Sequence, residues 1–162
     1  MSTENNAVRS VLVTGSSRGI GRAIAENLAA QGFAIAVHCR SQRDAAEDVC
    51  ASIEEQGGTA RILQFDVADR EAAAAALEAD MAVNSAYYGV VCNAGLTADN
   101  AFPSLTPAQW DAVLDTNLGG FYNIVHPVTM PMVRARRGGR IITLSSVSGI
   151  MGNRGLVNYS AA

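Results

Sequence analysis

The stretch that decides the fold lies near the N-terminus and reads Val11-Leu12-Val13-Thr14-Gly15-Ser16-Ser17-Arg18-Gly19-Ile20-Gly21. An apolar run followed by closely spaced glycines is typical of a buried strand that turns sharply into a helix. Unpaired backbone N–H groups and the positive end of a helix dipole then meet at one point, which suits a pyrophosphate. Gly15 and Gly19 would let the backbone turn, and Gly21 would let the helix lie close to the sheet. The stretch predicts a nucleotide-binding loop, although such glycines also occur in simple turns.

Composition is that of an ordinary folded domain. The 162 residues are 49 % hydrophobic and 17 % charged, and the net charge is -3. We expect a single domain over residues 1–162, and the negative charge argues against a nucleic-acid partner. No apolar run reaches the roughly 18 residues that cross a bilayer, and the polar first six residues do not resemble a signal peptide, so we expect a cytoplasmic protein. Three widely spaced cysteines, Cys39, Cys50 and Cys92, are expected to be reduced packing residues, with no metal site.

Short apolar runs alternate with longer helical patterns along the chain. The runs predict strands at residues 10–14, 34–39, 61–65, 88–92 and 140–144, and the helical patterns predict helices at residues 19–31, 42–56, 70–81 and 107–125. This alternation predicts an α/β fold with a doubly wound parallel sheet of order 3-2-1-4-5, whose strands are apolar because helices cover both faces. Thr106 and Gln109 form an expected capping box around Pro107. Pro127 and Pro131 are expected to kink or end the last helix.

Small polar residues follow three of the predicted strands. In a doubly wound sheet, ligands bind at the carboxyl ends of the strands, where the winding direction changes. Asp66 follows the third strand, Asn93-Ala94-Gly95 the fourth, and Ser145-Ser146 the fifth. Asp66 could equally cap a turn or contact an adenine edge, and Asn93-Ala94-Gly95 could form an ordinary turn. Their occurrence at one edge of the sheet favours a binding site.

The end of the second strand bears on the choice of nucleotide. An NAD site usually has Asp or Glu about 20 residues beyond the glycines. The sequence at that place is His38-Cys39-Arg40-Ser41, without a carboxylate. Arg40 could pair with a 2′-phosphate, helped by Arg18, although each could be a plain surface arginine. We therefore expect NADP(H) rather than NAD, and a packing or surface role for His38.

Ser146 and Tyr159 are the candidates for chemistry. They lie thirteen residues apart, at a strand end and in a segment that could open a helix. A tyrosine can donate a proton to a carbonyl that receives hydride, but its ordinary pKa near 10 calls for a nearby cation. A lysine one helical turn later would supply that charge, yet all 12 basic residues are arginine.

Together these motifs resemble those of the short-chain dehydrogenase/reductase family. The matching elements, in family order and spacing, are Thr14-Gly15-x3-Gly19-Ile20-Gly21, Asn93-Ala94-Gly95, Asn117 within Asp115-Thr116-Asn117, Ser146 and Tyr159. The resemblance covers the whole chain but about two-thirds of a usual member, with five of the usual seven strands. Residues 140–162 look most like those of 3-oxoacyl-[acyl-carrier-protein] reductases, which use NADPH in fatty-acid synthesis.

The resemblance implies a role for each matching residue. Tyr159 would protonate the substrate oxygen as hydride arrives, Ser146 would hydrogen-bond that oxygen, and Asn117 would hold a water in the proton relay. An isolated Asn117 would more often cap or pack a helix, and the spacing to Tyr159 favours Ser146 over Ser145. The implied cofactor-binding residues are Gly15, Ser16, Ser17, Arg18, Gly19, Ile20, Gly21, Arg40, Ser41, Asp66, Val67, Asn93, Ala94 and Gly95.

Two departures from the family pattern weaken the expected activity. The first asparagine of its Asn-Asn-Ala-Gly motif is Cys92, and its catalytic lysine and substrate-covering loop have no counterpart in these 162 residues. An NADPH-dependent reductase of 3-oxoacyl thioesters is the leading hypothesis, and we expect the 162-residue polypeptide itself to be nearly inactive. A catalytically dead NADP-binding module and a non-functional fragment are the alternatives.

The expected partners come from the same resemblance. Arg134, Arg136 and Arg137 form a basic cluster at a helix end. Such a cluster is most often a solvated terminus that favours the helix dipole, but it could dock an acidic acyl carrier protein. A homotetramer is implied for the full-length protein, because family members commonly assemble so.

Overall fold

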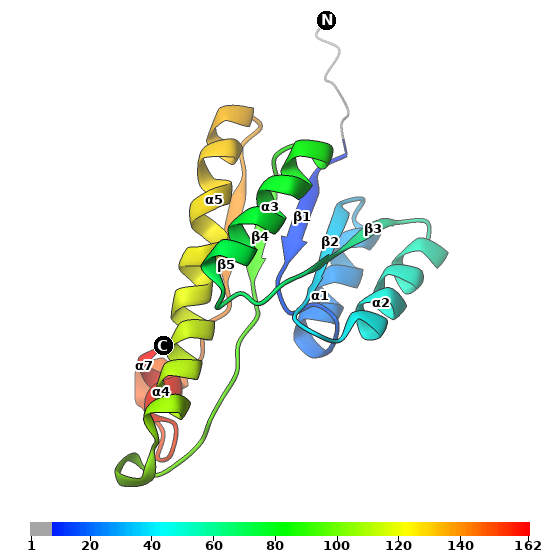
Figure 1. Ribbon diagram of the computed structural model, residues 1–162. Coiled ribbons are helices and arrows are strands. Elements are labelled where there is room, and N and C mark those ends of the chain that lie inside the picture. Colours follow the sequence, from blue (N-terminus) through cyan, green and yellow to red (C-terminus); the bar gives the residue numbers. More distant parts are fainter. Residues whose placement is uncertain (1–7) are drawn as a thin grey trace, which may run out of the picture.

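The computed structural model describes residues 8–162 as a five-stranded sheet between layers of helices (Figure 1). All strand pairs are parallel and the order is β3-β2-β1-β4-β5, which confirms the predicted topology. The strands are β1 (Ser10–Val13), β2 (Ala34–Cys39), β3 (Thr59–Gln64), β4 (Gly89–Cys92) and β5 (Arg140–Thr143). The helices are α1 (Gly19–Ala30), α2 (Arg43–Glu55), α3 (Arg70–Asn84), α4 (Pro107–Leu114), α5 (Gly120–Ala135), α6 (Ser148–Met151) and α7 (Val157–Ala161), with a 3₁₀ turn η1 (Phe102–Ser104) and a π-helical segment η2 (Asp115–Gly119).

Two hydrophobic cores lie on opposite faces of the sheet. Val11 and Val13 of β1 pack with residues of α1 and α2, whereas Leu12, between them, packs with residues of α3 and α5. This alternation follows from the two-residue period of a strand. Strands β1, β2 and most of β4 are buried, as expected for a sheet covered on both faces. The expectation fails for the edge strands, because β3 is half-buried and all four residues of β5 are exposed.

The segment that was predicted as one helix over residues 107–125 is longer and is interrupted. Its start is as expected, because Thr106 and Gln109 form the capping box ahead of Pro107. However, Pro127 and Pro131, which were expected to kink or end the helix, lie inside α5 and do not end it. Burial of side chains of α5 against β4 and α3 outweighs the loss of two backbone donors. The irregularity lies upstream instead, in η2.

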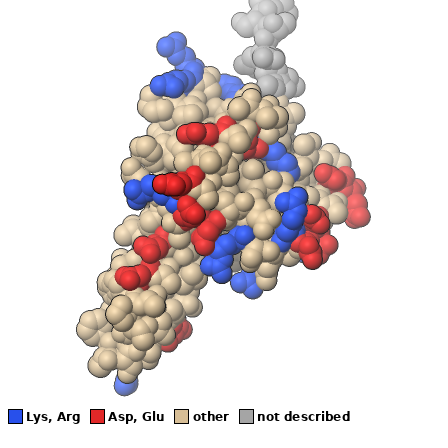
Figure 2. All heavy atoms as spheres, viewed as in Figure 1, with Lys and Arg blue, Asp and Glu red and all other residues tan. Residues whose placement is uncertain are grey.

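Charged groups of both signs share the surface. On the face shown in Figure 2, acidic and basic side chains are interspersed around the sheet, and the extension that carries α4 has few of them. Some form pairs one helical turn apart, such as Arg43 with Glu47 at 3.0 Å. In residues 8–162 no helix is both long and apolar enough to cross a bilayer.

A buried polar network joins β1, β3 and α3. The Arg61 guanidinium donates to both carboxylate oxygens of Asp80, at 2.6 and 2.7 Å, and to the Ser10 hydroxyl at 2.9 Å. The Tyr87 hydroxyl and the Asn84 amide also donate to Asp80, whose side chain is 4 % exposed. Burial alone would raise the pKa of Asp80, but these hydrogen bonds outweigh it and hold the pKa below its usual value.

Replacement of Asp80 with Asn should lower the free energy of unfolding by about 3 kcal/mol, because Arg61 would keep its charge without a carboxylate. Since the pKa of Asp80 is lowered in the folded state, its contribution is present above the unfolded-state pKa and is lost as the pH falls through the folded-state value. Urea denaturation at several pH values measures both effects. Glu47→Gln, which breaks an exposed pair, is the control and should cost less than about 0.5 kcal/mol. Equal losses for the two variants would contradict the prediction.

Candidate functional site

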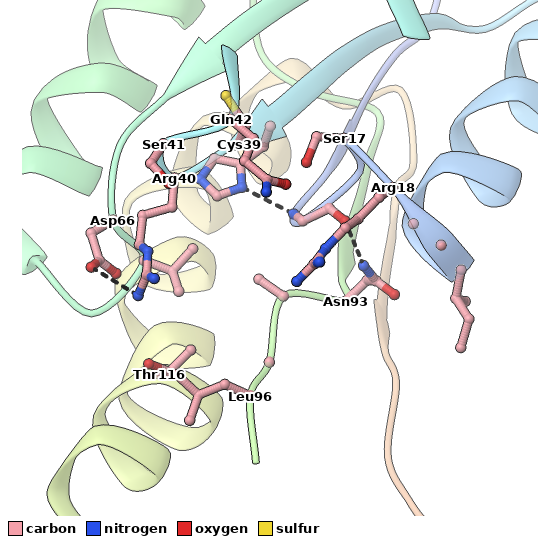
Figure 3. A pocket seen from close by; sticks show the side chains of 18 residues that line it. Ser17, Arg18, Cys39, Arg40, Ser41, Gln42, Asp66, Asn93, Leu96 and Thr116 are labelled. Carbon is pink, nitrogen blue, oxygen red and sulfur yellow. Dashed lines mark hydrogen bonds and ion pairs between the residues drawn. The ribbon is translucent and has the colours of Figure 1, made fainter. Parts of the chain in front are cut away.

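Two adjoining cavities form one cleft at the carboxyl ends of the strands. One, of about 430 Å³, lies beside the loop between β1 and α1 and reaches the end of β2 (Figure 3). The other, of about 460 Å³, lies between the ends of β4 and β5 and α7. Both are lined by Ile20, Asn93, Ala94 and Gly95, so they meet at the loop after β4. The chain winds in opposite directions from β1 and from β4, and the cleft lies where ligands collect in such sheets.

The glycine loop has the geometry that its sequence predicts. Gly15 and Gly19 have φ of 64° and 57°, a region that favours glycine. A Cβ on Gly21 would lie 2.4 Å from the Gly15 carbonyl oxygen and 2.5 Å from Asn93 Nδ2, so the helix can approach the loop only with glycine here. No side chain among residues 8–162 caps the start of α1. Its first-turn N–H groups lie at the cavity and suit an anion.

Asn93 and Thr14 hold together the loop after β1 and the loop after β4, where the winding direction of the chain changes. The Asn93 amide donates to the carbonyl oxygens of Thr14 at 2.8 Å and Gly15 at 3.2 Å. The buried Thr14 hydroxyl accepts hydrogen bonds from the backbone N–H groups of Asn93 and Ala94, at 2.9 and 3.0 Å. The Asn93 side chain therefore fixes the glycine loop to the loop after β4.

Ser16 and His38 lie beneath the glycine loop. The Ser16 side chain is fully buried, donates to the Val13 carbonyl at 2.7 Å and accepts from the His38 N–H at 2.9 Å. Unlike its neighbours, Ser16 does not line the cavity, so its side chain supports the loop from inside. The His38 ring bonds to the Gly15 N–H and the Phe65 carbonyl. Burial lowers the pKa of His38 to about 4, so the ring is neutral at physiological pH.

The far end of this cavity carries the residues expected to select the nucleotide. Arg40, Ser41, Asp66 and Val67 all line it. Arg40 Nη1 lies 3.9 Å from the Asp66 carboxylate, and both side chains are exposed (Figure 3). The other Asp66 oxygen accepts from the Ala68 N–H at 3.0 Å, which is the turn-capping role that the sequence left open. Asp66 thus caps its own turn while it faces the cavity.

Ser146, Tyr159 and Asn117 come together at the second cavity. All three line it, and Ser145 does so too. The Asn117 side chain is committed, because its oxygen accepts from the Leu96 N–H at 2.9 Å and its nitrogen donates to the Leu96 carbonyl at 3.1 Å. Asn117 lies within η2, and π-helical segments often mark functional sites. The amide itself acts here as a support for the loop after β4.

The catalytic candidate Tyr159 is positioned by its neighbour. The Asn158 side chain is fully buried and donates to the carbonyls of Ala98 and Gln109, each at 3.1 Å. Its oxygen accepts from the Tyr159 N–H at 2.9 Å. These bonds fasten the start of α7 to α4 and to the loop after β4.

Residues 9–162 match the family profile described as short chain dehydrogenase. The chain belongs to the short-chain dehydrogenase family. A 3-oxoacyl-[acyl-carrier-protein] reductase of Aggregatibacter actinomycetemcomitans is 60 % identical over 152 residues, which cover 94 % of this chain and 63 % of the relative. An acetoacetyl-CoA reductase of Shinella zoogloeoides is 43 % identical and covers 95 % and 61 %. The chain thus spans between 61 % and 63 % of the length of these two family members.

Solved structures of family members have the same architecture. A gluconate 5-dehydrogenase of Burkholderia cenocepacia in complex with NADP and tartrate superimposes with a TM-score of 0.88 at 32 % identity, covering 94 % of this chain and 59 % of that one. A 3-oxoacyl (acyl-carrier-protein) reductase of Agrobacterium tumefaciens with NADP bound gives 0.87 at 32 % identity, with 94 % and 58 % covered. The predicted doubly wound fold is thereby confirmed for the region described.

Sequence reasoning assigned no supporting role in this cleft to three of its residues. Thr14, His38 and Asn158 are buried polar residues that hold its loops. A histidine inside the apolar strand Ala34–Cys39 was a usable signal, because a buried polar group needs partners. Cys92 packs as expected but also lines the second cavity, where burial raises the pKa of its thiol to about 11. No pattern in the sequence around Asn158 indicates its supporting role, which becomes visible only in the three-dimensional structure.

Replacement of Gly21 with Ala should destabilise the protein by at least about 1 kcal/mol. The new methyl group would overlap the Gly15 carbonyl and the Asn93 amide, which outweighs the gain in helix propensity. Urea denaturation measures the change. Gly149→Ala is the control, because its Cβ would lie 3.8 Å from the nearest atom, the Ser160 carbonyl oxygen. Equal stability of the Gly21 and Gly149 variants would contradict this prediction, because the added methyl group at position 21 would then fit without a clash.

Proposed function

We propose that this chain forms the cofactor-binding and carbonyl-reducing part of an NADP-dependent oxidoreductase. Its substrates would be 3-oxoacyl thioesters on acyl carrier protein, reduced to 3-hydroxyacyl thioesters in fatty-acid synthesis. One observation carries the proposal: the cavity beside the glycine loop and Arg40 adjoins the cavity of Ser146 and Tyr159. The substrate class is supported by the activity for which the relative that is 60 % identical is named.

The residues of the first cavity fit a dinucleotide phosphate. Backbone already approaches so closely at Gly15 that a Cβ would lie 3.0 Å from Ala94 Cα, and the start of α1 is uncapped by residues 8–162. Ser17 to Gly21 would hold the pyrophosphate, on a loop that Gly15 turns. Arg40 and Ser41 would hold a 2′-phosphate, Asp66 and Val67 the adenine, and Asn93 to Gly95 the nicotinamide ribose. The bound cofactor supplies a hydride. The chain's task is to orient the cofactor and to manage the substrate proton.

The residues of the second cavity suit proton delivery to a carbonyl. We propose that the Tyr159 hydroxyl gives its proton to the substrate oxygen and that the Ser146 hydroxyl donates a hydrogen bond to the same oxygen. Because the side chain of Asn117 already pairs with Leu96, any water that Asn117 holds would bind its backbone. In our proposal Asn117 also keeps the loop after β4 in register with the catalytic residues.

Replacement of Arg40 with Gln should weaken NADPH binding about tenfold or more and change NADH binding by less than about threefold. The reason is that a charge-assisted bond to the 2′-phosphate would be lost. Isothermal titration of both nucleotides measures this, without a need for turnover. Arg43→Gln, close by on α2 but paired with Glu47, is the control and should leave both affinities unchanged. Equal weakening of NADPH and NADH by Arg40→Gln would contradict the assignment.

Replacement of Tyr159 with Phe should lower kcat for acetoacetyl thioester reduction by about 10²-fold or more while NADPH affinity stays the same, because only the proton donor is removed. The rate of NADPH oxidation is measured on the whole polypeptide that the gene encodes. Tyr122→Phe, an exposed tyrosine of α5, is the control and should retain full activity. NADPH binding without turnover in the unmodified whole protein would contradict the reductase proposal and leave a nucleotide-binding module.

We further propose that residues 1–162 alone turn over very slowly, because they contain no lysine.

The same proposal includes a protein partner, a homotetramer and a cytoplasmic location. Arg134 lies in the last turn of α5, Arg136 ends it with φ of 52°, and Arg137 donates to the Ala86 carbonyl at 3.0 Å. All three side chains are exposed, which supports docking of an acidic carrier. They lie near the amino ends of β4 and β5, at the other end of the sheet from the cleft, so a carrier docked on them would have to present its acyl chain from that end. Exposed apolar side chains on α5, Met130 and Val133 among them, support assembly through this helix.

A further inference from the structure

His38 bridges two loops of the cofactor cavity through both nitrogens of its ring. Nδ1 lies 3.0 Å from the Gly15 backbone nitrogen, in the loop between β1 and α1. Nε2 lies 3.1 Å from the carbonyl oxygen of Phe65, in the loop between β3 and α3. These loops line the pyrophosphate and adenine sides of the proposed cofactor site. The imidazole therefore connects two segments that must both meet one ligand.

The partners of His38 determine its tautomer. The Phe65 carbonyl only accepts hydrogen bonds, so Nε2 must carry the proton. The Gly15 N–H only donates, so Nδ1 must be unprotonated. His38 is 2 % exposed, and its ring lies 4.4 Å from the Phe65 ring, centroid to centroid, so the imidazole is packed away from solvent. His38 is thus held as the neutral Nε2–H form, and its surroundings match that form at both ends.

The backbone of His38 reinforces this bridge. The Ser16 N–H donates to the His38 carbonyl at 3.0 Å, and the His38 N–H donates to the Ser16 hydroxyl at 2.9 Å. The residue therefore makes three hydrogen bonds to consecutive positions of the glycine loop. The Gly15 N–H points to His38 and not to the cavity, so its contribution to a phosphate is to fix the loop while later N–H groups make contact.

We infer that His38 is a positioning residue for the dinucleotide: its Nδ1 holds the glycine loop in the conformation that the cofactor needs, and its bond to the Phe65 carbonyl fixes the orientation and tautomer of the ring. This inference rests on the proposed NADP binding. It assigns no contact of His38 with substrate. The proposed role requires a hydrogen-bond acceptor at the position of Nδ1. Without one, the Gly15 N–H must find another partner, and the loop moves.

The test compares two replacements of nearly the same shape. His38→Asn keeps an oxygen at about the position of Nδ1, whereas His38→Leu does not. We expect the dissociation constant of NADPH, from isothermal titration of the folded proteins, to stay within about threefold for Asn and to rise about tenfold or more for Leu. Tyr87→Phe is the matched control: it removes a buried hydrogen bond to Asp80 remote from the cleft and should lower stability without changing the dissociation constant.

A spectroscopic measurement on the unaltered protein keeps the inference testable even if the Leu variant fails to fold. Nitrogen NMR at neutral pH should show an unprotonated Nδ1 and a protonated Nε2 for His38. A protonated Nδ1, equal NADPH affinities for the Asn and Leu variants, or an equal loss in Tyr87→Phe would each overturn the role of His38 and leave the proposed function intact. Absence of NADPH binding by the unaltered protein would overturn both.

Discussion

The hydrogen bonds of Asn93 with Thr14 and Gly15 are the constraint on which the cleft depends. β1 and β4 are neighbours in the sheet, but the chain leaves them toward opposite faces, so their following loops would otherwise separate. The Asn93 amide and the Thr14 hydroxyl hold these loops together at 2.8 to 3.2 Å. Only glycine at position 21 leaves space for that amide. These two side chains thereby set where the two cavities meet.

The sequence was sufficient for the features that depend on local chemistry. The positive φ of Gly15 and the close approach at Gly21 follow from glycine spacing, and the strand order follows from the alternation of apolar runs and helices. Features that depend on tertiary packing were out of reach. Pro127 disfavours a helix by itself, yet the apolar face of α5 keeps the helix intact. Likewise, nothing in the spacing of Ser16 shows that its hydroxyl turns inward to Val13.

The two halves of the cleft, the proposed cofactor half beside the glycine loop and the proposed catalytic half beside Ser146 and Tyr159, are supported in different ways. The cofactor half is anchored to β1 and β2, whose residues are buried, so its loop geometry is tied to the hydrophobic core. The catalytic half depends on side chains that bind backbone: Asn117 holds Leu96, and Asn158 holds Ala98. Beside it, β5 and α6 have no fully buried residue. The catalytic half therefore has fewer buried apolar contacts to keep it closed.

This difference explains why sequence reasoning could name Ser146 and Tyr159 but not account for their placement. Ser146 follows a strand whose residues are exposed, and its hydroxyl accepts from the Ser148 N–H at 3.2 Å. Tyr159 lies in a helix of five residues, too short to be stable by itself. Asn158 compensates for this short length, because its buried amide donates to two carbonyls and accepts from the Tyr159 N–H. Tyr159 is thus held on a short helix by hydrogen bonds of the residue before it, and its placement depends more on that amide than on helix propensity.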